Sequence, residues 1–287
     1  MKEINKLLKK YGLRSTSYKI EGNVIYINTN KGLFVVKKNN VDSKVLEYIN
    51  NRGFKQYPDT IFDKYTISKY EIDSDIPSEQ KMFDLIDTIG NLHSKTAFYK
   101  EVSSYDYKTI YEDILNNLEY LYNYYTDYIG MIDEKIIYSP SEFLLARNIS
   151  YIFDAIESSR NYINEWYKKI ENIDKIRVSV IHNNLDLTHF IRNKKNYLIS
   201  FDKSKIDMPI YDLYKLYNKY YIDYNFNEIL NRYESIYPLK DYEKELFLVL
   251  INIPKKIVFT NEYDTCVSIS NEIDRLYKSN ELKNSLK

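Results

Sequence analysis

The spacing of apolar residues changes near Pro77, and that change most constrains the fold. Before it, the segment SYKIEGNVIYINTNKGLFVVKK (residues 17–38) alternates apolar and polar residues in three short runs, separated at Gly22 and Gly32. Alternation with a period of two residues is typical of strands, and short glycine-containing turns between them predict an antiparallel meander. After Pro77 the apolar residues recur at the 3.6-residue period of helices. The sequence therefore predicts a strand-rich part followed by a helical part.

The same reasoning places the remaining elements. In the first part we expect a helix at residues 2–10, a helix over DSKVLEYINNRG (42–53) that Gly53 stops, and two further strands within residues 57–73. In the second part we expect helices over residues 78–96, 105–127, 140–171, 210–235 and, with breaks, 241–280. A β-type hairpin interrupts them at residues 178–202. The predicted fold class is α+β: two lobes, a small β-rich lobe at residues 1–75 and a larger, mainly helical lobe at residues 76–287.

Composition excludes several classes of function. The formal net charge is zero, so no basic footprint for nucleic acid is expected. No segment approaches the about 20 apolar residues that span a membrane, and the N-terminal residues lack the apolar core of a signal peptide. Cys266 is the only cysteine, so no intrachain disulfide can form. We expect a cytoplasmic protein.

A series of short segments, each weak alone, has a recognisable order. GLFVVKK ends a strand with Lys37, KVLEYI places Glu47 on the next helix, and HNNLDLTH, ISFD and PIYDL follow at residues 182–189, 199–202 and 209–213. In this order they resemble the aminoglycoside phosphotransferase and choline kinase branch of the protein-kinase-like fold, and most of all the bacterial spore-coat kinase-like proteins. The resemblance implies that Lys37 contacts nucleotide phosphates and that Glu47 pairs with Lys37. It also implies ATP and Mg²⁺ as cofactors.

The matched catalytic segment lacks the side chains that carry the chemistry. The resemblance places Asn184 at the catalytic Asp position, with His189 and Ser200 at the metal-binding Asn and Asp positions. Asn184 is neutral and not a useful base, and Mg²⁺ prefers anionic oxygen ligands to imidazole nitrogen or a hydroxyl. His182 and Asp212 are retained, and their implied work is to hold the loop in shape. The resemblance thus implies that residues with a structural role are retained and that residues with a chemical role are replaced.

These substitutions predict a catalytically impaired pseudokinase with a binding or spore-coat assembly role, whose partners would be other coat or assembly proteins. The turn KIEGNVIY has one glycine, which predicts weak or absent nucleotide binding. Two alternatives stay open. One is an active ATP-dependent small-molecule phosphotransferase that uses Asp186 as base and Asp202 as metal ligand. The other is a pseudokinase that keeps a nucleotide as a structural ligand.

Overall fold

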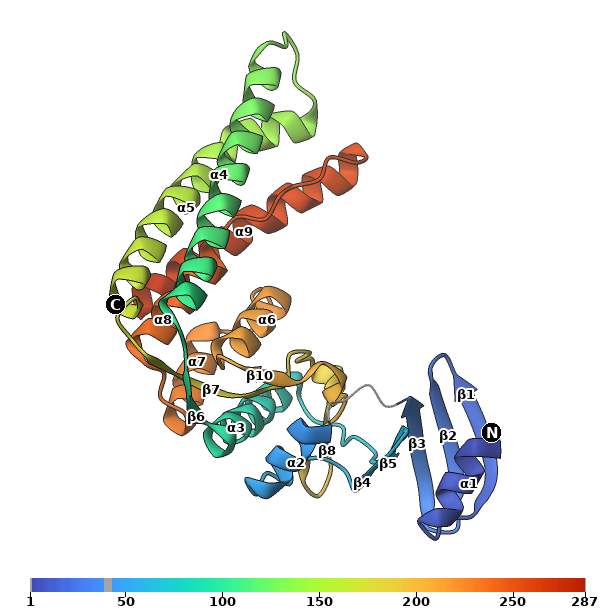
Figure 1. The fold of residues 1–287 in the computed structure, drawn as a ribbon. Helices are drawn as coiled ribbons and strands as arrows, with labels where there is room; N and C mark the ends of the chain where they lie inside the picture. Colours follow the sequence, from blue (N-terminus) through green and yellow to red (C-terminus); the bar gives the residue numbers. More distant parts are fainter. Residues whose placement is uncertain (1, 39–42, 287) are drawn as a thin grey trace. The chain divides into compact units, whose positions relative to one another are not determined.

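The chain folds into two compact units (Figure 1). The computed structural model describes residues 2–38 and 43–286. The first unit comprises Met1–Ala97, Ser179–Asp212 and Arg232–Tyr237, and the second comprises Phe98–Val178, Leu213–Asn231 and Pro238–Lys287. This division differs from the predicted boundary after residue 75, because residues 76–97, 179–212 and 232–237 group with the N-terminal sheet.

An antiparallel five-stranded sheet dominates the start of the first unit. Its strands are β1 (Ser15–Glu21), β2 (Val24–Thr29), β3 (Gly32–Lys38), β4 (Thr60–Phe62) and β5 (Tyr65–Lys69), in the order β1-β2-β3-β5-β4. Helix α1 (Lys2–Lys10) contributes Ile4 and Leu8 to the core over one face of this sheet. Ile27, Val36 and Ile67 are fully buried in the same core. Because side chains alternate along a strand, Val35 and Lys37 point to the opposite face.

Two helices complete the early part of the first unit, α2 (Ser43–Asn51) and α3 (Ser78–Thr96). Gly53 has φ +75°, the left-handed conformation that ends a helix at low steric cost, so the predicted stop signal is confirmed. The predicted start of α2 at Asp42 lies outside the described residues. Helix α3 is buried along its apolar stripe, and its Gly90 lies against Ile236, which a Cβ would approach to 3.1 Å. The 3.6-residue period read from the sequence is thus the core face of α3.

The segment after residue 174 is more divided than the single predicted hairpin. It holds β7 (Lys175–Ile181), β8 (Phe190–Arg192), β9 (Asn196–Leu198) and β10 (Lys205–Asp207), with 3₁₀ turns at η1 (Leu187–His189) and η2 (Phe201–Lys203). Strands β8 and β9 form a hairpin, whereas β10 pairs with the end of β7. Strand β10 was not predicted, nor was β6 (Phe98–Glu101), which pairs with β7 in the second unit. Both missed strands are only three or four residues long, too short for a periodicity to register.

The second unit is built around the helical hairpin of α4 (Ser104–Asp133) and α5 (Pro140–Ile170), green to yellow-green in Figure 1. Ser139 and Glu142 form a capping box at the start of α5, with Pro140 in the first turn. Helices α8 (Asp241–Asn252) and α9 (Glu262–Ser285) pack against α5. Among the described residues, no helix has both the length and the apolar content to span a membrane.

The predicted helix over residues 210–235 is wrong as a single helix. The chain instead forms α6 (Ile210–Tyr220) and α7 (Phe226–Ile236). Asn225 explains the break, because its side-chain oxygen accepts a hydrogen bond from Asn227 N at 3.1 Å and so starts a new helix. The break expected within residues 241–280 has a similar cause: Asn261 Oδ1 caps α9 by accepting from Asp264 N at 2.9 Å.

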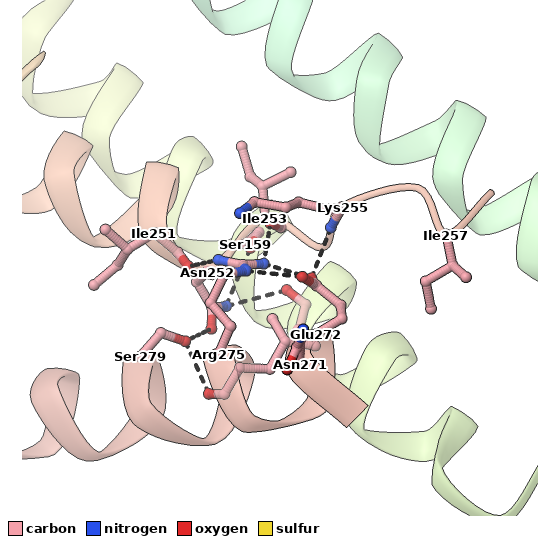
Figure 2. Close-up of polar contacts among 12 residues, drawn as sticks. Ser159, Ile251, Asn252, Ile253, Lys255, Ile257, Asn271, Glu272, Arg275 and Ser279 are labelled. Carbon is pink, nitrogen blue, oxygen red and sulfur yellow. Dashed lines mark hydrogen bonds and ion pairs between the residues drawn. The ribbon is translucent and has the colours of Figure 1, made fainter. Parts of the chain in front are cut away.

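A buried polar cluster joins the end of α8 to α9 (Figure 2). Arg275 is 1% exposed and lies beside Glu272, which is 5% exposed. Its guanidinium donates to the carbonyls of Ile251 and Ile253, which the end of α8 leaves without helical partners, and to both oxygens of Glu272. Lys255 N donates to Glu272 Oε1 at 2.7 Å. The cluster satisfies the C-terminus of α8 from within the core.

Candidate functional site

The pocket of the first unit lies against the face of the sheet that α1 leaves open. Its cavity volume is about 190 Å³, below the roughly 300–1,000 Å³ of typical ligand pockets. The sheet contributes side chains from β2, β3 and β5, and the opposite wall comes from the hairpin β8–β9 and from η2. Apolar lining residues are Val24, Val35, Pro58, Ile191, Leu198, Ile199 and Phe201, and polar ones include Lys37, Glu71, Ser200 and Asp202. A mainly apolar slot with a few polar groups suits a flat aromatic ring.

Lys37 is the cation of β3 that faces this pocket. Its Nζ donates to Ser200 Oγ at 3.2 Å. Ser200 has φ 66° and ψ 51°, a left-handed conformation uncommon for a residue other than glycine. Glu47, the partner implied by the family resemblance, is exposed on α2. The structure therefore brings Lys37 to Ser200 and not to Glu47.

The loop after β7 is anchored to Asp212 through its backbone N–H groups. His182 N and Asn183 N donate to the two carboxylate oxygens of Asp212, each at 2.7 Å. The buried His182 ring donates through Nε2 to Ile199 O at 2.8 Å, which ties the loop to the end of the β8–β9 hairpin. Burial lowers the pKa of the His182 imidazole, against the opposing charge of Asp212, so the ring is neutral at pH 7. These contacts make His182 a positioning group rather than a base.

Asp212 sits at the centre of a buried network that the sequence analysis identified only in part. Asp212 and His93 are both fully buried, and His93 Nε2 donates to Asp212 Oδ2 at 3.2 Å. Tyr233 OH donates to His93 Nδ1 at 2.7 Å. The contacts of Asp212 with His93, and of His93 with Tyr233, were not predicted from the sequence. Tyr233 could not have been found from the sequence, since 140 residues separate it from His93 and one tyrosine among 32 carries no signal.

Asn184 and His189 contact one another and do not line the pocket. His189 Nδ1 donates to the backbone carbonyl of Asn184 at 2.8 Å. Asp186 is the N-cap of η1, and its Oδ1 accepts from both the backbone N and the hydroxyl of Thr188 at 2.8 Å. None of these three residues lines the pocket, whereas Ser200 and Asp202 do. Of the two carboxylates in the alternative active site, only Asp202 therefore lies beside the pocket.

The donors present do not fit a magnesium ion. At the lysine end of the pocket they are the Ser200 hydroxyl and one carboxylate, Asp202, which is exposed. Mg²⁺ in a kinase is held by anionic oxygens in near-octahedral geometry. Across residues 2–38 and 43–286, no group of three or more His, Cys, Asp or Glu side chains is arranged as a metal site. The oxygen that accepts from Lys37 is thus the neutral Ser200 hydroxyl, with the Asp202 carboxylate among the other lining groups.

Arg192 is a further positioning residue that sequence reasoning missed. Its backbone forms two hydrogen bonds, from Arg192 N to Asp73 Oδ1 at 2.9 Å and from Ser74 N to Arg192 O at 2.6 Å. Its guanidinium pairs with Asp84 of α3. Because the neighbouring Ile191 lines the pocket, these contacts fix one wall.

Comparison with solved structures places this arrangement in a known fold. The crystal structure of an aminoglycoside phosphotransferase from Alicyclobacillus acidocaldarius superposes with a TM-score of 0.69 at 10% identity, over 95% of this chain and 91% of that chain. The AMP-bound complex of spectinomycin phosphotransferase, APH(9)-Ia, gives 0.52 at 13% identity, over 99% and 94%. A putative aminoglycoside phosphotransferase from Ralstonia eutropha gives 0.51 at 11% identity, over 99% and 98%. No family model and no curated protein sequence matches the chain.

The chain has the protein-kinase-like fold of the aminoglycoside phosphotransferases, an N-terminal antiparallel sheet followed by a mainly helical region. The predicted fold class is confirmed. Identities this low support the fold alone, so the narrower resemblance to spore-coat kinase-like proteins stays a prediction.

Proposed function

We propose that this protein is a pseudokinase that binds an adenine nucleotide in the pocket of its first unit and does not transfer phosphate. A nucleobase suits the apolar slot between the sheet and the β8–β9 hairpin, and Lys37 suits a phosphate at the polar end. The AMP-bound spectinomycin phosphotransferase shares the fold and supports a nucleotide as ligand. A binding or assembly role, in a spore coat as the resemblance implies, belongs to the same proposal.

The observation that carries the proposal is the Lys37–Ser200 hydrogen bond of 3.2 Å. In kinases the charge that develops on the phosphates is neutralised by metal ions held on carboxylate and amide oxygens, and a carboxylate orients the attacking hydroxyl. Here the oxygen beside the lysine belongs to a hydroxyl. Asn184 takes the implied base position and is neutral at every pH, so it cannot accept the proton of an attacking alcohol.

One observation favours a second candidate, an active small-molecule kinase. Asp202 lines the pocket with Lys37 and could supply a single anionic oxygen. Oδ1 of Asp186, the second carboxylate of this candidate, accepts two hydrogen bonds within its own turn. The other carboxylate that lines the pocket, Glu71, pairs with Lys69 at 3.5 Å and accepts from Asn193 at 3.1 Å. Because Asp186 and Glu71 are both engaged in these contacts, we rank this candidate second.

Nucleotide titration with and without metal tests the proposal. We expect ATP to stabilise the protein equally in EDTA and in Mg²⁺, by about 2.7 kcal/mol at a concentration 100 times the dissociation constant. Lys37→Ala should weaken binding, whereas Lys194→Ala, which removes an exposed lysine outside the pocket, should not. Absence of any ATP effect would refute nucleotide binding. ATP turnover that Asp202→Ala abolishes would refute the pseudokinase assignment and establish the second candidate.

A further inference from the structure

The tip of the α4–α5 hairpin, residues 131–143, lies where two long helices are connected (Figure 1). It carries an exposed apolar patch. Ile136 is 100% exposed and Ile137 is 83% exposed, although isoleucine is among the residues most often buried. Met131, Tyr138 and Phe143 are exposed around them. A shallow groove runs between Ile136, Tyr138 and Phe143. Contiguous apolar surface of this kind on a folded chain marks an interaction site. We call residues 131–143 the hairpin tip.

The surroundings of the hairpin tip are acidic. Within residues 127–147 and 258–264, Asp and Glu number six and Lys and Arg number two. One of the two cations, Lys135, is paired with Glu142. Asp133 and Glu134 are exposed beside the two isoleucines. The C-terminus of α4 adds negative partial charge, while the positive end of α5 is neutralised by Glu262, whose carboxylate accepts from Ser141 N.

This charge pattern decides between possible occupants. A second copy of the chain meeting tip to tip would place Asp133 and Glu134 against their own duplicates, and like charges across an interface are costly. An anionic membrane surface would be repelled for the same reason. A protein segment with an apolar centre and a basic rim is complementary to the tip in both respects. Amphipathic helices offer that combination on one face.

We propose that the hairpin tip is a docking site for a basic amphipathic helix of a partner protein, held by Ile136 and Ile137 at its centre and by Asp133 and Glu134 at its rim. This inference does not depend on nucleotide binding, because every residue that carries it belongs to the second unit.

Synthetic amphipathic helices provide the probe. We expect a fluorescent 14-residue Leu/Lys helix to bind the full chain, and an equally amphipathic Leu/Glu helix to bind about tenfold more weakly or worse. Ile136→Ser/Ile137→Ser should lower the affinity for the Leu/Lys helix by about tenfold or more. The matched control is Ile222→Ser, which removes a 61% exposed isoleucine outside the tip and should leave binding unchanged. Asp133→Lys/Glu134→Lys should reverse the preference between the two peptides.

Each contrary result overturns the proposal in a distinct way. Equal binding of the Leu/Lys helix by the wild-type chain and the double serine variant would mean that the tip is not the site. Co-sedimentation with phosphatidylglycerol vesicles that the serine variant abolishes would make the occupant a membrane. A dimer in analytical ultracentrifugation that the serine variant abolishes would make it a second copy. The replaced side chains are exposed, so an unchanged melting temperature verifies that every variant is folded.

Discussion

Arg275 allows the sharpest test of what holds the second unit together. We consider Arg275→Met, which keeps an unbranched apolar stem and removes the guanidinium. The change deletes the two bonds to Glu272, at 2.9 and 2.6 Å, and the bonds to the carbonyls of Ile251 and Ile253. The Glu272 carboxylate, which is 5% exposed, then keeps the hydrogen bond that it accepts from Lys255 N but loses its cationic partner (Figure 2).

The expected loss follows from that orphaned charge. Removing one partner of a buried ion pair costs about 3–5 kcal/mol, because the remaining charge stays buried without compensation. For a chain of this length, that loss lowers the melting temperature by about 6–20 °C. The individual bonds do not add up separately, since water and side-chain relaxation recover part of each.

Urea unfolding at pH 7, followed by circular dichroism, measures this free energy of unfolding. The matched control is Lys278→Met on the same helix: its pair with Glu281 is half exposed and contributes at most about 1 kcal/mol. A double variant, Glu272→Gln/Arg275→Met, should be more stable than Arg275→Met alone, because no buried charge is left unpaired. A loss below about 1 kcal/mol for Arg275→Met, or a double variant less stable than the single one, would refute the reasoning.

Three further predictions concern the first unit. Burial lowers the pKa of His182, so the unfolded state binds the proton first as the pH falls below about 6.5. The free energy of unfolding should then drop by up to about 1.4 kcal/mol per pH unit. His182→Gln should flatten that slope, measured by urea unfolding between pH 7 and 5. An unchanged slope would contradict this assignment. Ser200→Asp places a carboxylate beside Lys37 and should make ATP affinity, measured by calorimetry, depend on Mg²⁺; metal-independent affinity in this variant would contradict our account of the missing ligand. Asp212→Asn should lower the free energy of unfolding by about 2–4 kcal/mol, because an amide NH₂ then faces a backbone N–H. The loop at Asn183 should become accessible to limited proteolysis. Protection equal to that of the wild type would show that the loop needs no anchor.

The hydrophobic pattern predicted most of the local structure. Helix α1, the meander of β1 to β3, and helices α3 and α5 begin and end within about two residues of the expected positions. These elements have strong periodicity or clear caps, and both signals depend only on residues close to one another in the sequence. The short strands β6 and β10 were missed because each is short and depends on pairing with β7. The break at Asn225 was missed although its cap is local, because the apolar spacing continues across it.

The candidate site divides in the same way. The family resemblance placed Asn184, His189 and Ser200 at the catalytic and metal positions, and their residue types then predicted poor replacements for the family's carboxylate and amide groups. That prediction needs no coordinates. Tertiary structure decided which groups meet. It directed Lys37 to Ser200 instead of Glu47, and it joined Tyr233 to Asp212 through His93. Contacts between residues 119 to 163 positions apart depend on how whole elements pack, and no local pattern encodes that packing.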